Sequence, residues 1–167
     1  MRHVLSAVVQ NVPGVLAHIS GMLASRGYNI DSLAVGETED PTVSRITIVA
    51  PGDERTLEQI IKQLNRLIDV IRVRDISKEP FIGRQLMLIR VKARPKERDE
   101  IIRIAGNVGA KVVEAHEESL ILEVVGDQAA MDTALALVKP FGVQEMVRTG
   151  RIALSLKKVL TAKDLKA

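Results

Sequence analysis

Residues 4–16 read VLSAVVQNVPGVL, and this stretch decides how the chain begins to fold. Its first half is a short apolar run rich in valine, which is typical of a buried strand. Residues 11–14 stop that strand, because asparagine, proline and glycine favour turns. Apolar side chains then recur at helical spacing as far as Leu23, and Gly27 follows where the helix would end. The segment therefore predicts a strand, a tight turn and a helix, in that order.

The remainder of the first half adds three strands and one more helix. Apolar and polar side chains alternate in residues 28–35 and again in residues 43–49, with a polar turn at residues 37–41. This period of two predicts two strands joined by the turn. Residues 57–68 carry apolar side chains at helical spacing, and residues 70–76 alternate as a closing strand. The order is thus strand, helix, strand, strand, helix, strand.

The second half repeats this order after a stretch without periodicity. Residues 78–84 contain Pro80 and Gly83, and we expect a linker there. The elements predicted beyond it are strands at 86–91, 111–115, 120–125 and 143–148, and helices at 98–108 and 128–138. Residues 152–156 are a candidate for an additional strand. The predicted organisation is a first domain at 1–77, a linker at 78–84, a second domain at 85–160 and a frayed tail at 161–167.

Two βαββαβ units in tandem predict an α+β protein with two ferredoxin-like domains. The right-handed crossover of each unit leaves a gap that the hairpin strand fills, which gives an antiparallel sheet of order 4-1-3-2 with both helices on one face. Residues 28–35 would form an apolar edge strand of the first sheet, and such an edge has to be covered or paired. Pairing with the same strand of a second copy would satisfy it, so we expect a homodimer.

The composition excludes several classes of function. The 167 residues contain no cysteine, which excludes disulfides, thiolate metal sites and a cysteine nucleophile. The three histidines are far apart in the sequence, and we expect no metal site. Only three aromatic residues occur and they do not cluster, which argues against binding of single-stranded nucleic acid. With no apolar run of about 18 residues and no signal-peptide pattern at the N-terminus, we expect no membrane partner and a cytoplasmic protein.

The turn at residues 11–16 is the strongest candidate for a binding site. Gly14 allows the backbone to approach a ligand closely, and the amides of Val15 and Leu16 lie in the first helical turn, where N–H groups lack intrahelical partners. Partial positive charge collects there and favours a small anion such as a carboxylate. Asn11 adds a side-chain donor and acceptor, which can serve both an α-ammonium and an α-carboxylate group. An ordinary Pro-Gly turn before a helix is the alternative interpretation.

A second candidate, Asn29, stands at the start of the predicted edge strand. Its side-chain amide could contact a ligand held across an edge-to-edge interface, and a turn-forming asparagine after a helix is the alternative. Catalytic signals are weak by comparison: the acidic pairs fall in polar turns or at helix starts, where acids suit the helix dipole. No phosphate-binding glycine loop and no nucleophile elbow occurs, so we expect no catalytic residues.

Several of these segments resemble one known family. The matching stretches are NVPGVL at 11–16, RGYNIDSL at 26–33, DPTVSRIT at 40–47, LEQIIKQLNRLIDV at 57–70 and QLMLIRV at 85–91. Together they are similar to the small, regulatory subunit of acetohydroxyacid synthase, also called acetolactate synthase, whose N-terminal part is an ACT domain. The first of these motifs is general to ACT domains, whereas its combination with the second and third is much more specific. The resemblance extends over nearly the whole chain.

The resemblance implies a regulatory subunit without catalysis of its own. In the family, a separate catalytic subunit carries thiamine diphosphate, Mg²⁺ and FAD, and the small subunit activates it and confers feedback inhibition by valine. Valine is bound between two ACT domains of a dimer. Carried over to this sequence, the implied valine contacts are Asn11, Gly14, Val15 and Leu16 of one chain, with Asn29 and Ile30 of its neighbour.

Two rival functions belong to other classes. A free-standing amino-acid-sensing ACT protein that acts on another partner, such as a transcription factor, would need a DNA-binding element, for which the 167 residues leave no room beside the two units. A small enzyme on a ferredoxin-like fold would show turnover by the isolated chain, which we do not expect.

Overall fold

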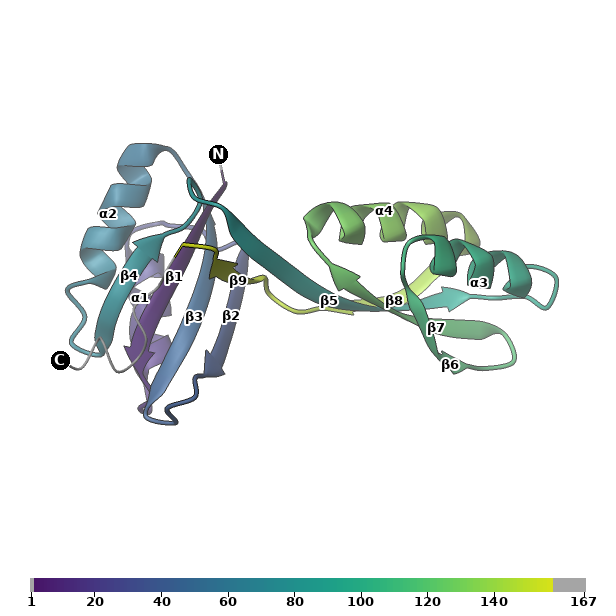
Figure 1. The fold of residues 1–167 in the computed structure, drawn as a ribbon, viewed down its shortest axis with the longest axis horizontal. Coiled ribbons are helices and arrows are strands. Elements are labelled where there is room, and N and C mark those ends of the chain that lie inside the picture. Colours follow the sequence, from purple (N-terminus) through teal and green to yellow (C-terminus); the bar gives the residue numbers. More distant parts are fainter. Residues whose placement is uncertain (1, 158–167) are drawn as a thin grey trace. The chain divides into compact units, whose positions relative to one another are not determined.

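The structure, a computed structural model, describes residues 2–157 and divides into two compact units (Figure 1). The first unit runs to Ile82 and takes up the chain again at Gly150, while the second is the continuous segment Gly83–Thr149. None of the helices in residues 2–157 is both long and apolar enough to cross a membrane.

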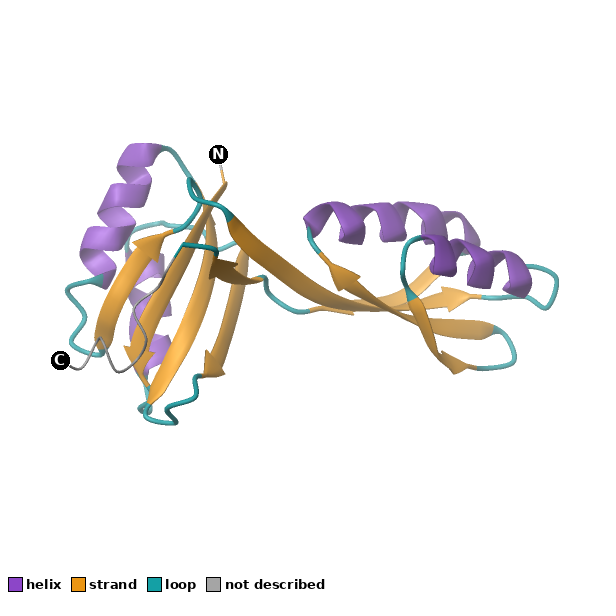
Figure 2. Cartoon of the chain, in the orientation of Figure 1, coloured by secondary structure: helices purple, strands orange, loops and turns teal. Residues whose placement is uncertain are grey.

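The first unit is a four-stranded antiparallel sheet with two helices. Its elements are β1 (Arg2–Gln10), α1 (Val15–Ser25), β2 (Ser32–Glu37), β3 (Val43–Pro51), α2 (Glu54–Leu64) and β4 (Val70–Asp75). The strand order β2-β3-β1-β4 confirms the predicted arrangement, and both helices cover one face of the sheet (Figure 2). Alternate residues of β1, such as Leu5 and Val9, point to that face and pack against Ile19 of α1 and Ile60 of α2.

The second unit repeats the arrangement. Its elements are β5 (Phe81–Lys92), α3 (Arg98–Asn107), β6 (Lys111–Ala115), β7 (Ser119–Gly126), α4 (Gln128–Val138), a short 3₁₀ helix (Lys139–Phe141) and β8 (Val143–Arg148). The strands follow the order β6-β7-β5-β8, the counterpart of the order in the first unit. Met87 and Ile89 of β5 are buried against Ile101 of α3 and Met131 of α4, which gives this unit a core of its own.

The linker predicted at residues 78–84 is wrong in its second half. Strand β5 begins at Phe81 and continues without interruption to Lys92, so residues 81–84 are extended and belong to a strand. Pro80 stands just before the strand, a position where the missing N–H costs no ladder hydrogen bond. The proline therefore marks the entry into β5, and Gly83 lies within the strand.

The predicted end of the second domain also differs from the structure. Residues 150–157, which we assigned to the second domain, return to the first unit, where β9 (Ile152–Ser155) pairs with β5. Ala153 joins a small buried cluster with Val4, Val49 and Ile76, on the sheet face opposite the helices. The sequence could not show this, because a four-residue strand does not encode its distant partner. The predicted frayed tail at 161–167 lies outside the described residues.

The returning segment is anchored on strand β2 by a close backbone contact. A Cβ atom built on Gly150 would overlap the main-chain oxygen of Leu33, far inside any van der Waals contact. Beside it, the backbone N–H of Arg151 donates to Oγ of Ser32 (2.7 Å). Only glycine fits between the two segments, so this position holds the end of the chain against β2.

Replacing Gly150 with alanine should therefore destabilise the first unit. The new methyl group has to displace the backbone of β2 or of its own segment, and overpacking of this kind costs about 1–3 kcal/mol. The free energy of unfolding from chemical denaturation measures the effect. Gly106→Ala is the matched control, because a Cβ there meets no atom within 4 Å. Equal stability of the two variants would contradict the contact.

Candidate small-molecule site

The turn between β1 and α1 holds the first group of candidate residues. The backbone N–H of Asn11 donates to the carbonyl of Thr42 (2.8 Å), which ties the end of β1 to the β2–β3 turn. Gly14 then precedes α1 with a φ of 90°, in the left-handed region that favours glycine. The glycine turns the chain so that the helix starts at Val15.

The start of α1 presents backbone N–H groups without acceptors. The N–H of Val15 reaches the carbonyl of Val12 only at 3.4 Å, and the first regular bond of the helix runs from His18 to Gly14 (2.9 Å). Within residues 2–157, no side chain caps this end and no acidic residue stands in the first turn. The N–H groups of Leu16 and Ala17 are therefore available to an anion, at the positive end of the helix dipole.

The candidate side chains of this turn differ in what they can contribute. Val15 is buried in the core of the first unit, so only its backbone can meet a ligand. Leu16 is 40% exposed and can cover an apolar side chain of a bound molecule. Asn11 and Gly14 are exposed, which leaves the turn open to solvent on the side of the free N–H groups.

The Asn11 side chain has partners that the sequence did not indicate. Its Nδ2 donates to Oε1 of Glu37 (3.1 Å) at the end of β2 and to the carbonyl of Pro41 (2.9 Å) in the following turn. The sequence places Glu37 at the start of a polar turn, at residues 37–41. Its role arises from the pairing of β2 with β3, and no signal in the sequence could have shown it.

Asn29 and Ile30 lie before β2 and not within it, so the predicted start of that strand at residue 28 is wrong. The N–H of Tyr28 still bonds to Leu23 of α1 (3.0 Å), and regular pairing begins only at Ser32. Ile30 is half-buried against the core, while Asn29 is exposed.

The Asn29 side chain is held by a carboxylate. Its Nδ2 donates to Oδ1 of Asp31 (3.2 Å), and the other oxygen of Asp31 accepts a hydrogen bond from Nε of Arg2 (2.8 Å). The pair resembles that of Asn11 with Glu37, since in each an asparagine N–H₂ group is bonded to an acidic side chain.

Within one chain the two groups of candidate residues stand at opposite ends of the sheet. Glu37, beside Asn11, pairs with Ser44, whereas Ser32, just after Ile30, pairs with Val49. The six residues of β2 span roughly 20 Å at the usual rise of a strand. A single chain therefore does not bring Asn29 and Ile30 to the β1–α1 turn.

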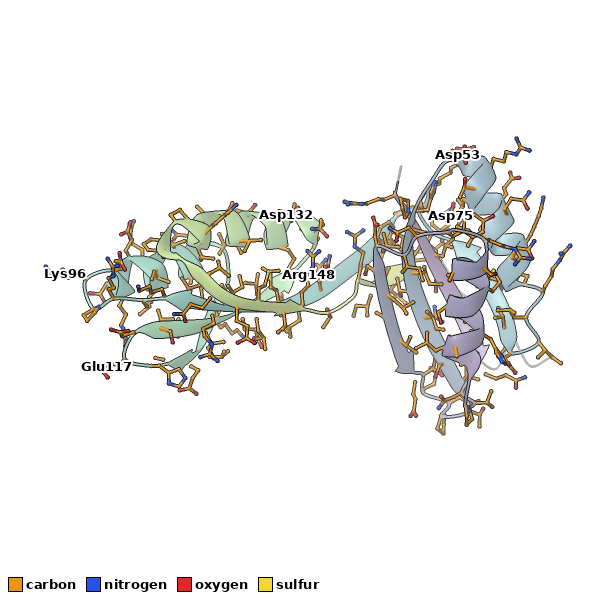
Figure 3. All side chains as sticks on the ribbon, turned by 180° about the vertical axis from the view of Figure 1, so that it is seen from behind. Asp53, Asp75, Lys96, Glu117, Asp132 and Arg148 are labelled. Carbon is orange, nitrogen blue, oxygen red and sulfur yellow. The ribbon has the colours of Figure 1, made fainter. Side chains whose placement is uncertain are left out.

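The acidic residues that the sequence analysis weighed have structural roles or stand apart. The backbone N–H of Thr56 donates to Oδ1 of Asp53 (2.7 Å), which caps α2 and holds the pKa of that carboxyl below its ordinary value. Asp53 precedes α2 in the first unit, whereas Glu117 lies in the turn between β6 and β7 of the second unit (Figure 3). In the described part of the chain no three His, Asp or Glu side chains gather where they could hold a metal ion.

A shallow hollow of about 140 Å³ lies on the second unit, on the sheet face opposite its helices. It is lined by Leu88, Arg90, Ile121, Glu145 and Val147. Nε of Arg90 lies 3.6 Å from Oε2 of Glu145 across its floor, and both side chains reach solvent. The polar groups that line the hollow are those of Arg90 and Glu145, which face each other, whereas the β1–α1 turn offers backbone N–H groups without acceptors, so the turn remains the candidate site.

Comparison with known proteins gives matches over both units. Residues 5–72 match the family model described as "AHAS small subunit-like ACT domain", and residues 84–157 match the model "Small subunit of acetolactate synthase". The chain is 43% identical to a probable acetolactate synthase small subunit from Archaeoglobus fulgidus, over 92% of this chain and 96% of that protein. An acetolactate synthase small subunit from Aquifex aeolicus is 42% identical, over 92% of this chain and 80% of that protein.

A solved structure shows the same fold. The crystal structure of the acetolactate synthase small subunit from Thermotoga maritima superposes with a TM-score of 0.87 and 33% sequence identity. The match covers 95% of this chain and 99% of that one. The likeness therefore includes both units.

The left-handed conformation at Gly14 leads to a test of the local geometry. Gly14→Ala should lower the free energy of unfolding by about 1–2 kcal/mol, because an L side chain is strained at a positive φ even where space is open. Gly21→Ala, in the middle of α1 with no atom within 4 Å of the added methyl, is the control and should be neutral or stabilising. A Gly14→Ala protein as stable as the parent would show that the turn adopts another conformation.

Proposed function

This chain belongs to the family of acetolactate synthase small subunits, and on that premise we propose that it is a non-catalytic regulatory subunit that activates the catalytic chain and makes it sensitive to valine. The N-terminal unit would be the effector-binding ACT domain. The thiamine diphosphate, Mg²⁺ and FAD of the reaction would be held by the catalytic chain, and the complex would work in the cytoplasm.

The observation that carries this proposal is the set of free backbone N–H groups beside Asn11. An α-amino acid has a carboxylate, an ammonium group and a side chain close together on one carbon. The N–H groups of Leu16 and Ala17 suit the carboxylate, the exposed side chain of Leu16 suits an aliphatic group, and the Asn11 amide is in reach of the ammonium. The turn thus offers one complementary partner to each part of valine.

The site becomes complete in a dimer formed through β2. This strand is at the edge of its sheet. Gly150 and Arg151 contact its first half, and its second half is exposed, with Val35 47% accessible. If two copies pair along β2 about a two-fold axis, with the segment around Gly150 displaced from Leu33, the strands run antiparallel, and the start of one lies beside the end of the other. The partner's Asn29 would then approach Glu37 and Asn11 of this chain. This pairing would bring together the two groups of candidate residues, which lie at opposite ends of β2 within one chain.

Regulation follows if valine binds two arrangements of the dimer unequally. A ligand can shift such an equilibrium only by its difference in affinity for the two states, and allosteric coupling is typically about 1–3 kcal/mol. A ligand held between two chains meets this condition, since any change in how the two edges pair alters its contacts.

The Asn11→Ala variant tests the proposal directly. We expect it to weaken valine binding by about tenfold or more in calorimetry, because it removes a hydrogen bond to a charged group. Reconstituted with a catalytic subunit, the variant should still activate but should no longer confer valine inhibition. Asn107→Ala, which removes an exposed asparagine at the end of α3, is the matched control and should leave both properties unchanged.

The two measurements separate the possible failures. Full valine sensitivity of the Asn11→Ala complex would contradict the site. Valine binding by the parent chain without any effect on a catalytic subunit would favour a free-standing sensor. Turnover of pyruvate by the isolated chain would contradict the regulatory assignment altogether.

A further inference from the structure

We propose that Glu37 acts as a positioning residue, which orients the Asn11 amide so that Asn11 offers only its carbonyl oxygen to a ligand. Asn11 would then bind the ammonium group of an amino acid and not its carboxylate. This inference rests on the proposed function of the β1–α1 turn and assigns the direction in which the amino acid lies there.

The orientation of the amide follows from the nature of its partners. The Nδ2 atom of Asn11 carries two hydrogens and lies within hydrogen-bond distance of Oε1 of Glu37 (3.1 Å) and of the Pro41 carbonyl (2.9 Å). An ionised carboxylate and a main-chain carbonyl can only accept hydrogen bonds. Both N–H groups are therefore used, and among residues 2–157 no donor is bonded to the remaining oxygen, Oδ1.

The reverse orientation is excluded by electrostatics. Rotation of the amide by 180° would place Oδ1 against the Glu37 carboxylate and the Pro41 carbonyl at these same distances. Each contact would then join two acceptors and lose a hydrogen bond, one of them to a charged group. Asn11 therefore has no donor left for a carboxylate as long as both contacts persist.

The two acceptors that hold Asn11 are themselves fixed by the hairpin. Glu37 is the last paired residue of β2, and the N–H of Thr38 bonds to the carbonyl of Val43 (3.0 Å) just beyond it. Within the turn, Oδ1 of Asp40 accepts from the backbone N–H of Thr42 (2.9 Å) and from its hydroxyl (2.6 Å). The position of the amide is thus set before any ligand arrives, which lowers the entropy lost on binding.

In this geometry the carboxylate and the ammonium group of the amino acid bind to different parts of the turn. Its carboxylate is left to the N–H groups of Leu16 and Ala17, at the positive end of α1, and its ammonium group to Oδ1 of Asn11. Asn29 shares part of this pattern, since its Nδ2 donates to Asp31 and no donor among residues 2–157 is bonded to its carbonyl oxygen. In the proposed dimer the partner's Asn29 would add a second acceptor for the ammonium group.

The inference predicts which molecules the site rejects. The 2-oxo acid with the same side chain as valine, 3-methyl-2-oxobutanoate, has the carboxylate and the aliphatic group but no ammonium donor. Against Oδ1 of Asn11 it would place an acceptor, and two acceptors in contact form no hydrogen bond and repel each other. The site would therefore distinguish an amino acid from the 2-oxo acid of the same carbon skeleton.

The test compares Glu37→Gln, Glu37→Ala and the parent chain by calorimetry with valine and with 3-methyl-2-oxobutanoate. In Glu37→Gln the side-chain carbonyl can still accept from Asn11, so we expect valine affinity within about twofold of the parent. In Glu37→Ala one N–H of Asn11 loses its acceptor and only the Pro41 carbonyl still holds the amide, so we expect valine binding to weaken by about fivefold. The preference for valine over the 2-oxo acid should narrow in the same variant. Glu39→Ala, an exposed acid in the same turn, is the control and should behave as the parent.

Three outcomes would overturn the inference, and each is distinct. Parental valine affinity of Glu37→Ala would show that Glu37 does not hold the amide. Equal losses in Glu37→Gln and Glu37→Ala would show that Glu37 acts through its charge and not by positioning Asn11. Absence of valine binding to the parent chain itself would contradict the effector site, and the role of Glu37 would fall with it. Thermal melts of each variant distinguish these results from loss of folding.

Discussion

The position of the central strand β1 is the constraint on which the first unit depends. It is bonded to β3 along one side and to β4 along the other, and its residues from His3 to Val9 are all buried. A strand that is enclosed on both faces and both edges cannot slide without exposing apolar side chains on one face or the other. The register of β1 therefore fixes the position of the turn that follows it. The position of β1 thereby also sets the backbone positions of Asn11 and of the free N–H groups of α1, although these groups are exposed.

The sequence predicted what depends on local periodicity and missed what depends on distant pairing. The strand order and the two-helix layers follow from alternation and helical spacing, and both are confirmed. The end of α2 was placed too late: Ile68 continues the helical spacing, but the helix ends at Leu64 and Ile68 is 90% exposed. Residues 81–84 were not predicted as part of β5, because Pro80 and Gly83 are typical of a loop. The return of β9 to the first unit was also missed, because a four-residue strand does not encode its partner.

In the candidate site, too, the features set by local sequence were predictable and those set by strand pairing were not. Gly14 and the amides after it were predictable, since proline and glycine before an amphipathic segment define such a turn. The bond from Asn11 to Glu37 joins residues 26 positions apart and exists only because β2 pairs with β3 in one register. Sequence therefore located the groups that could bind a ligand, while the structure showed which atom of Asn11 remains for it. A carbonyl oxygen can accept a hydrogen bond from an ammonium group, whereas an N–H group would be needed to bind a carboxylate.

The discontinuity of the first unit has a consequence for biosynthesis. A chain leaves the ribosome from its N-terminus, so strands β1 to β4 and then residues 83–149 leave it before β9 does. The first unit, although started earlier, still lacks the strand that buries Val4, Val49 and Ile76. The domain that is translated first is thus completed last. During that interval its sheet presents an apolar patch to water, which is a natural target for a chaperone or for a partner chain that assembles during translation.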